Sequence, residues 1–299
     1  MPDQNDRWFD WLLQVRHGGD TDYAAALQPM LLDIRDRLLD HAVLRPGLHV
    51  VDVGCGDGLA GLGALERERT SEVTFVDISP ALLEHTRAVA AGRGFAGRCR
   101  FIVASAESLA VIPSASADVV LVRAVLAYVR DKAAAIGEFR RILRPGGRIS
   151  IVDPIFQDQA LRLAGIAAQL RAEDCGAATR YFELLHRCRS AHFPDTIDAL
   201  TADPLTNYNE RDLLRLLESA GFEDAHLRLH IDSIPALPMP WHVFLRSSPF
   251  AGAPTVGEIL QARFAPDERL EFERFIRPGV EAGTATERNV NAYLFARVP

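Results

Sequence analysis

The chain has 299 residues, 48% of them hydrophobic and 24% charged, which is enough to bury the core of one large domain without metals or disulfides. The net charge of −7 argues against a nucleic-acid partner, because affinity for phosphates depends mostly on Lys and Arg. No stretch approaches the roughly 20 apolar residues of a membrane span, and the acidic start lacks the basic residues of a secretion signal. The four cysteines form no C-x-x-C pair, so we expect no metal site and a reducing, cytoplasmic environment.

The first segment of the chain is predicted to be helical. Residues 7–15, RWFDWLLQV, carry apolar side chains at helical spacing, and Gly18-Gly19 then interrupts the pattern. A second helix is predicted over 23–44, and Pro46-Gly47 ends this N-terminal portion.

Short apolar strands and amphipathic helices then alternate along the chain. The strands are predicted at 49–53, 72–78, 100–104, 117–124 and 148–153. Helices are predicted at 59–69, from Pro80, and at 131–143, with a turn at 144–147 before the fifth strand. This alternation predicts βαβ units and a parallel sheet.

The alternation fails after Asp153-Pro154 and returns later. Residues 155–205 are predicted to be largely helical. A capped helix at 209–222 and a strand at 225–231 restore the earlier pattern. Residues 233–290 are irregular and rich in proline, and 291–298 are predicted to form a final strand.

The stretch VVDVGCGDGLAG, residues 50–61, joins the first strand to the first helix of the sheet. A strand, a glycine loop and a helix place backbone N–H groups and a helix N-terminus at one point, where a ligand can approach closely. A nicotinamide dinucleotide would bring its pyrophosphate there, and Asp57 would repel it. S-adenosylmethionine (SAM) brings a sulfonium and an ammonium, which Asp52 and Asp57 suit.

Asp77 ends the second strand, just over 20 residues after the loop begins. A carboxylate in that place accepts hydrogen bonds from both ribose hydroxyls of an adenosine. This holds equally for NAD and SAM, so Asp77 predicts a nucleoside without choosing between the two.

Six ordered motifs together resemble the class I SAM-dependent methyltransferases, and more narrowly their small-molecule branch, labelled type 11/12 or UbiE-like. They are VVDVGCGDG, VTFVDIS, ASAESL, DVVLVRAVLAYV, EFRRILRPGGRISIVDP and the closing AYLFARVP. The resemblance covers about residues 46–153, 206–232 and 291–298. It implies an α/β fold with a Rossmann-like seven-stranded sheet in the order 3-2-1-4-5-7-6, the last strand antiparallel.

The resemblance also implies cofactor contacts for particular positions of this chain. The methionine end of SAM would be lined by Asp52, Gly54, Gly56 and Gly58. Asp77 and Ile78 would hold the ribose and flank the adenine, and Ala106 and Glu107 would meet the adenine edge. Ser105 departs from the family, which commonly has Asp there, and Arg123 would reach the carboxylate of SAM or of a substrate.

The remaining segments are expected to close the site. Residues 1–45 are predicted to form an N-terminal helical lid on the domain 46–299, with substrate-cap insertions at 155–205 and 233–290. In the lid, Arg16, His17 and Tyr23 would face the cofactor carboxylate or the substrate. The predicted substrate contacts are Trp11, Arg180, Tyr181 and Trp241, and the candidate general bases are His17, His186 and His242.

These observations predict a SAM-dependent methyltransferase that acts on an oxygen or nitrogen atom of an amino-acid-derived or secondary metabolite. Two alternatives stay open, an NAD-dependent oxidoreductase and a SAM-fold binding module without catalysis. The expected partner is a small-molecule substrate, with no nucleic acid and no membrane. A homodimer is a candidate assembly, with the tryptophan-bearing N-terminal arm as its contact.

Overall fold

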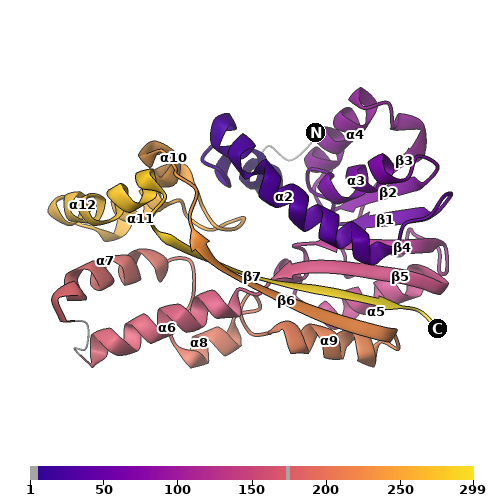
Figure 1. The fold of residues 1–299 in the computed structure, drawn as a ribbon. Helices are drawn as coiled ribbons and strands as arrows, with labels where there is room; N and C mark the ends of the chain where they lie inside the picture. The colour runs from indigo at the N-terminus through magenta and orange to yellow at the C-terminus, as the bar shows by residue number, and fades with distance from the viewer. Residues whose placement is uncertain (1–5, 173–175) are drawn as a thin grey trace.

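The computed structural model of this chain describes residues 6–172 and 176–299. Its centre is one seven-stranded sheet in the order β3-β2-β1-β4-β5-β7-β6 (Figure 1). β1 to β5 are parallel, and β7 is antiparallel to both of its neighbours, which confirms the predicted fold class. The strands are β1 (His49–Val53), β2 (Glu72–Asp77), β3 (Cys99–Val103), β4 (Ala117–Arg123), β5 (Leu143–Pro154), β6 (Glu223–Pro235) and β7 (Thr286–Arg297).

Helices cover both faces of the sheet because neighbouring residues of each buried strand point to opposite faces. Val50 packs on the face covered by α2 (Thr21–Ala42), α3 (Leu59–Arg67) and α4 (Pro80–Gly92). Its neighbour Val51 packs on the face covered by α5 (Lys132–Ile142) and α9 (Glu210–Ser219). The central strands β1 and β4 are therefore buried on both faces, whereas β6 is largely exposed, and the strand ends are open to ligands.

The two insertions pack against each other as a second, smaller body beside the sheet (Figure 1). The first contains α6 (Gln157–Arg171), the 3-10 turn η4 (Gly176–Ala178), α7 (Thr179–Arg189) and α8 (Ile197–Ala202). The second contains α10 (Trp241–Arg246), α11 (Val256–Arg263) and α12 (Pro266–Ala282). Side chains of α7, α10, α11 and α12 share one apolar core, so we call the two insertions together the cap.

The largest differences from the sequence prediction lie in β5, β6, β7 and the second insertion. Residues 233–290 were predicted to be irregular, but they contain the helices α10, α11 and α12. β6 and β7 are longer than predicted and continue past the sheet as a hairpin, so the helices of the second insertion begin only at Trp241. Residues 144–147, predicted as a turn, belong to β5 instead. There Gly146 adopts a φ of +77°, and the pairing with β4 jumps from Leu143 to Arg148, which accommodates the extra residues as a bulge.

The N-terminal segment is helical over the predicted range but is split in two. α1 (Arg7–Asp10) is followed by η1 (Trp11–Val15), which is a π-helix. Gly18 and Gly19 then adopt positive φ angles of 60° and 69°, and Asp20 begins α2 by accepting a hydrogen bond from the backbone N–H of Tyr23.

Among the described residues, no helix combines the length and the apolar character needed to cross a membrane.

Candidate functional site

The glycine loop between β1 and α3 lies at the carboxyl end of the sheet, where β1 has β2 on one side and β4 on the other. Gly54, Gly56 and Gly58 all have positive φ angles, of 64°, 56° and 78°. At Gly54 a Cβ would lie 2.4 Å from the side chain of Val125, so the position has no room for a larger residue. The loop thus brings bare backbone to the N-terminus of α3 at the point where the sheet reverses its strand order.

Asp77 ties the end of β2 to this loop. Its two carboxylate oxygens accept hydrogen bonds from the backbone N–H groups of Gly56 and Ser79, both at 2.9 Å. Burial raises the pKa of Asp77, and these backbone hydrogen bonds oppose that effect. Each oxygen keeps a second lone pair, so the carboxylate can still accept from a ribose hydroxyl.

The two acids inside the glycine motif have protein partners, which the sequence did not reveal. Asp52 is only 1% exposed, and it accepts a hydrogen bond of 2.8 Å from the backbone N–H of Gly61 beneath the loop. Burial raises the pKa of Asp52 to about 7, so this group is partly protonated near neutral pH. Asp57 accepts a 3.1 Å ion-pair hydrogen bond from Arg123. The negative field predicted for this spot is therefore largely compensated inside the protein.

Apolar side chains lie open at the ends of the next two strands. Ile78 is 48% exposed after β2, and Val103 is 57% exposed at the end of β3. Ala106 is buried, and a carboxylate oxygen of Glu107 accepts a 2.7 Å hydrogen bond from the backbone N–H of Asp131. Ile78 thus leaves apolar surface directly after Asp77, at the carboxyl end of β2.

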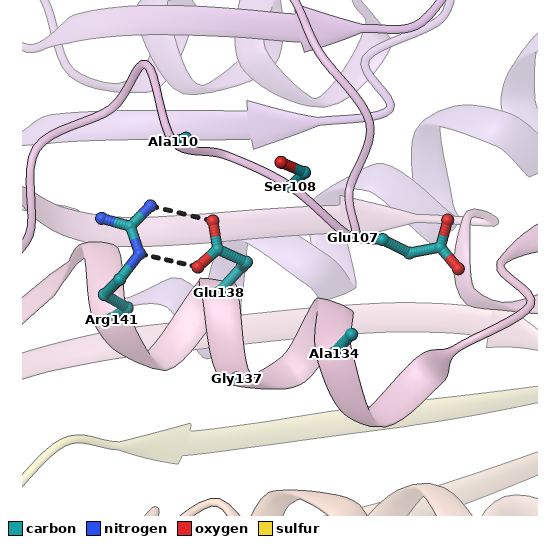
Figure 2. Close-up of a pocket in the computed structure, with 7 residues that line it drawn as sticks. All are labelled: Glu107, Ser108, Ala110, Ala134, Gly137, Glu138 and Arg141. Carbon is teal, nitrogen blue, oxygen red and sulfur yellow. Dashed lines mark hydrogen bonds and ion pairs between the residues drawn. The ribbon is translucent and has the colours of Figure 1, made fainter.

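Glu107 also lines a surface hollow of about 600 Å³ beside α5, and Figure 2 draws the residues that line it. Glu138 and Arg141 form a bidentate ion pair there. Arg141 Nε donates to Oε1 of Glu138 at 2.7 Å, and Arg141 Nη2 donates to Oε2 at 2.9 Å. Glu138 also accepts from the backbone N–H of Leu109, and Arg141 donates to its carbonyl oxygen. The pair therefore fastens the loop after β3 to α5, and Glu107 points away from it.

The N-terminal arm lies across the glycine loop. A Cβ on Gly56 would lie 3.0 Å from the side chain of Leu12, so η1 rests directly on the loop. The indole N–H of Trp11 donates to the carbonyl oxygen of Ser248 in the cap, at 3.2 Å. The rings of Trp8 and Trp11 approach Tyr128 edge-on, with centroids at 5.2 and 6.5 Å. The arm thus packs on its own chain and connects the loop to the cap.

The structure brings the three predicted polar residues of the lid to this region. Arg16 lies close to Arg123, Asp57 and Tyr128, and burial together with Arg123 lowers its pKa. Among the described residues, no carboxylate is hydrogen-bonded to the Arg16 guanidinium. Burial, followed by the charge of Arg16, lowers the pKa of His17 to about 4. Burial and the nearby Glu287 raise the pKa of Tyr23 to about 12, and its ring lies 6.2 Å from that of His17.

The structure surrounds the predicted substrate contacts of the cap with other cap residues. Arg180 donates hydrogen bonds to three carboxylates, those of Glu183, Glu268 and Glu271. The ring of Tyr181 packs edge-on against Phe182 and Phe275.

Trp241 is 8% exposed and packs on Phe244 and Phe272 in the cap core. The candidate bases are also separated. His186, on α7, forms a 2.9 Å hydrogen bond with Asp195, and His242 is exposed on α10. Of the three candidate bases, His17 is therefore the one near the glycine loop.

Sequence reasoning missed a buried acid that organises the site. Asp153, at the end of β5, is completely buried and accepts hydrogen bonds of 2.8–2.9 Å from the backbone N–H groups of Val125, Leu126 and Ala127. It thereby fixes the turn that carries both Val125, packed on Gly54, and Tyr128. The sequence position of Asp153 could have indicated this role, because Asp153 lies at the end of a buried strand, as Asp77 does.

The sheet order, the glycine crossover and the acid at the end of β2 define a Rossmann-like domain that binds a nucleoside cofactor. A family described as a methyltransferase domain matches residues 44–221. The chain belongs to this family of class I methyltransferases, whose cofactor is S-adenosylmethionine. The family match also decides against the NAD-dependent oxidoreductase that the glycines alone left open.

Named relatives agree with this family. A malonyl-[acyl-carrier protein] O-methyltransferase of Serratia marcescens is 33% identical over 134 residues, which are 45% of this chain and 48% of that protein. A ubiquinone/menaquinone biosynthesis C-methyltransferase UbiE of Shewanella pealeana is 32% identical over 212 residues, 67% of this chain and 76% of that protein. The chain thus spans about half the length of the first relative and about three quarters of the second.

Solved structures share the fold. The YcgJ protein of Bacillus subtilis matches with a TM-score of 0.52 at 16% identity, over 88% of this chain and 97% of that one. The [4+2]-cyclase SpnF matches with a TM-score of 0.50 at 21% identity, over 89% and 81%. Likenesses of this kind establish the fold and leave the reaction to the residues of the site.

Proposed function

We propose that this chain transfers the methyl group of SAM to an oxygen or nitrogen atom of a small molecule bound between the N-terminal lid and the cap. The observation that carries the proposal is His17, a neutral imidazole that the lid places beside Arg16, Asp57 and the glycine loop. An acceptor hydroxyl or ammonium must lose a proton, and an unprotonated imidazole can take it. The low pKa keeps the His17 ring unprotonated at neutral pH and also makes it a weaker base than an ordinary histidine. By their names, the malonyl-[acyl-carrier protein] and nocamycin relatives are O-methyltransferases, which supports oxygen as an acceptor.

The residues around the glycine loop fit the cofactor of the family. When bound, SAM supplies an electrophilic methyl group on a positively charged sulfur. Asp77 would accept from the ribose hydroxyls, and Ile78 with Ala106 would border the adenine. Gly54, Gly56 and Gly58 would leave room for the methionine part along the backbone.

Two arginines and one acid are available for the charged end of the cofactor. Among the described residues, Arg16 forms no ion pair with a carboxylate. Arg123 is the one described basic side chain that forms an ion pair with Asp57. We assign the SAM carboxylate to Arg16 and its ammonium to Asp57, with Arg123 holding Asp57 in place. Asp52 acts beneath the loop as the acceptor for Gly61 N–H rather than as a direct contact.

The lid would exclude water from the reaction. Leu12 lies on Gly56, and Trp8 and Trp11 lie against Tyr128, so apolar side chains seal the loop on the solvent side. Water exclusion strengthens the charge interactions within the site and protects the reactive methyl group.

Calorimetry followed by a methylation assay tests the proposal. SAM and its demethylated product should bind, and a candidate acceptor should be methylated by the wild-type chain. His17→Ala should lower kcat by about 10²-fold, the lower end for a general base, with little change in SAM affinity, whereas His186→Ala and His242→Ala serve as matched controls. If SAM binds but no acceptor is methylated, the chain is a binding module without catalysis. If His17→Ala is as active as the wild type, His17 is not the general base.

The pKa of His17 also predicts a pH dependence. Its folded pKa of about 4 lies below the ordinary 6.5, so the docked lid favours the neutral ring. The lid is therefore fully stabilised above about pH 6.5 and loses stability as pH falls toward 4, because the released ring binds the proton more tightly. SAM affinity should fall through this window in the wild type and less in His17→Gln. Parallel curves for the two proteins would contradict the lid assignment.

The finer substrate class, an amino-acid-derived or secondary metabolite, rests on the resemblance to the small-molecule branch. A cytoplasmic location and the lack of a nucleic-acid partner stay predictions from the acidic composition and the scattered cysteines. The division into a lid at 1–45 and a domain at 46–299 is likewise a proposal, which limited proteolysis within Gly18-Gly19 would test.

A further inference from the structure

β6 is the last strand of the sheet, and among the described residues only β7 pairs with it. The pairing with β7 runs without interruption from His226 to Pro235. Figure 1 shows β6 at the edge of the sheet, so every second residue of the described strand directs its backbone N–H and C=O groups away from β7. A long, regular edge of this kind is a template for another strand. Two of the usual protections, a bulge and a proline, stand only at the ends of this edge, because the bulge precedes His226 and the first proline of the strand is Pro235.

The side chains of this edge divide between its two faces. Arg228 and His230 lie on the face toward α2, where they are bonded to His41 and Arg37. Leu229 and Ile231 lie on the other face and are 39% and 50% exposed. These two apolar side chains provide surface that a partner strand can contact.

The edge is complementary to itself. In a two-fold antiparallel pair, opposite residues share a face, and centring the pair on His230 sets Arg228 opposite Asp232 of the partner subunit and Leu229 opposite the partner's Ile231. By symmetry each of these pairs occurs twice. Centring on Arg228 or on Asp232 would instead set like charges opposite each other, which is unfavourable.

We propose that two copies of this chain form a dimer in which their β6 strands pair antiparallel about His230 and extend the two sheets into one. Opposite charges on one face and apolar contacts on the other fix the register. Each copy carries a net charge of −7, so the local Arg228–Asp232 complementarity offsets a general repulsion. The dimer would also brace the β6–β7 hairpin that carries the second half of the cap.

Charge reversal tests the register through sedimentation measurements at micromolar concentration. The wild type should be a dimer. Arg228→Asp alone or Asp232→Arg alone places like charges opposite each other at two points, and each should raise the dimer dissociation constant by about tenfold or more. The double variant R228D/D232R restores opposite charges and should restore the dimer. Arg211→Asp, an exposed reversal on α9, is the matched control and should leave the assembly unchanged.

A cysteine on the two-fold axis provides an independent test that does not depend on charge. Two copies of residue 230 would have Cα atoms about 4.5–5.5 Å apart, within the range for a disulfide. His230→Cys should therefore cross-link under mild oxidation, whereas His226→Cys, opposite Ile234 of the partner subunit, should not. Circular dichroism checks that each variant is folded. A monomeric wild type at 100 µM, a dimer unaffected by single reversals, or no cross-link at 230 would each overturn the proposal.

Discussion

The cofactor half of the sheet, by which we mean β1, β2 and the glycine loop, differs from the cap in how directly the sequence predicts the role of each residue. In the cofactor half, Asp77 and the three glycines of the loop lie together at the carboxyl ends of β1 and β2. In the cap, Arg180 and Trp241 carry chemistry that suits a substrate, yet each is occupied by cap residues. A motif tied to a strand end fixes its place in space, whereas a reactive residue on an inserted helix carries no such information.

The largest expected effect tests whether the cap is an independent packing unit. Trp241→Ala removes a large ring from the cap core and should lower the free energy of unfolding by about 3–5 kcal/mol. SAM affinity, measured by calorimetry, should change less than about threefold. The exposed neighbour His242→Ala is the control for both quantities. If Trp241→Ala lost SAM affinity together with stability, the cap would not be an independent packing unit.

The glycine loop should respond in the opposite way. Gly54→Ala combines a left-handed backbone with a clash against Val125, and should weaken SAM binding by about tenfold or more and cost about 1–3 kcal/mol of stability. Gly47→Ala is a matched control, because Gly47 has a φ of +76° and no atom within 4 Å of the added Cβ. It should be destabilised by backbone strain alone and bind SAM normally. Equal SAM affinity in both variants would show that the cofactor lies elsewhere.

Substitution of Asp77 tests whether this carboxylate binds the ribose of SAM. Asp77→Ala removes an acceptor for two backbone N–H groups and for the ribose, and should weaken SAM binding by about 1–3 kcal/mol. Asp118→Asn is the control, because Asp118 also accepts from a backbone N–H but belongs to the start of β4. Unaltered affinity of Asp77→Ala in calorimetry would remove this residue from the ribose role.

The smallest expected effect concerns Arg180 on α7. Its ion pairs with Glu183, Glu268 and Glu271 are substantially exposed and therefore screened, so Arg180→Met should cost at most about 1 kcal/mol in urea unfolding. The kinetic constants KM and kcat should not change. A rise in KM with kcat unchanged would return Arg180 to the substrate site, as its sequence position first indicated.

Most of the sheet could be predicted because hydrophobic periodicity and glycine positions are local properties. The predicted strand at 49–53 matches β1, and the predicted 72–78 exceeds β2 by one residue. The lengths of β6 and β7 were underestimated because their exposed, mixed edge lacks the apolar pattern of a buried strand. Asp153 was missed because its three backbone donors come from a turn that only folding brings to it.

The charges of the site show the same division. Asp52 and Asp57 indicated a positively charged ligand, and the family match confirms SAM. The structure nonetheless compensates both acids, through Gly61 N–H and Arg123. Which acid remains free to meet a ligand depends on partners that lie far away in the sequence.

The sequence alone determined the Rossmann-like sheet and the nucleoside site at its first crossover, because each depends on residues within one turn or one strand. It also located both insertions, but the helices of the second one appeared only in the tertiary structure. Only the tertiary structure decided that Asp52 accepts from the Gly61 N–H, that the N-terminal arm rests on Gly56 and that Trp241 belongs to the cap core. The physical reason is that burial and pairing are set by contacts between segments distant in the chain, and these contacts decide whether a polar or aromatic side chain is available to a ligand.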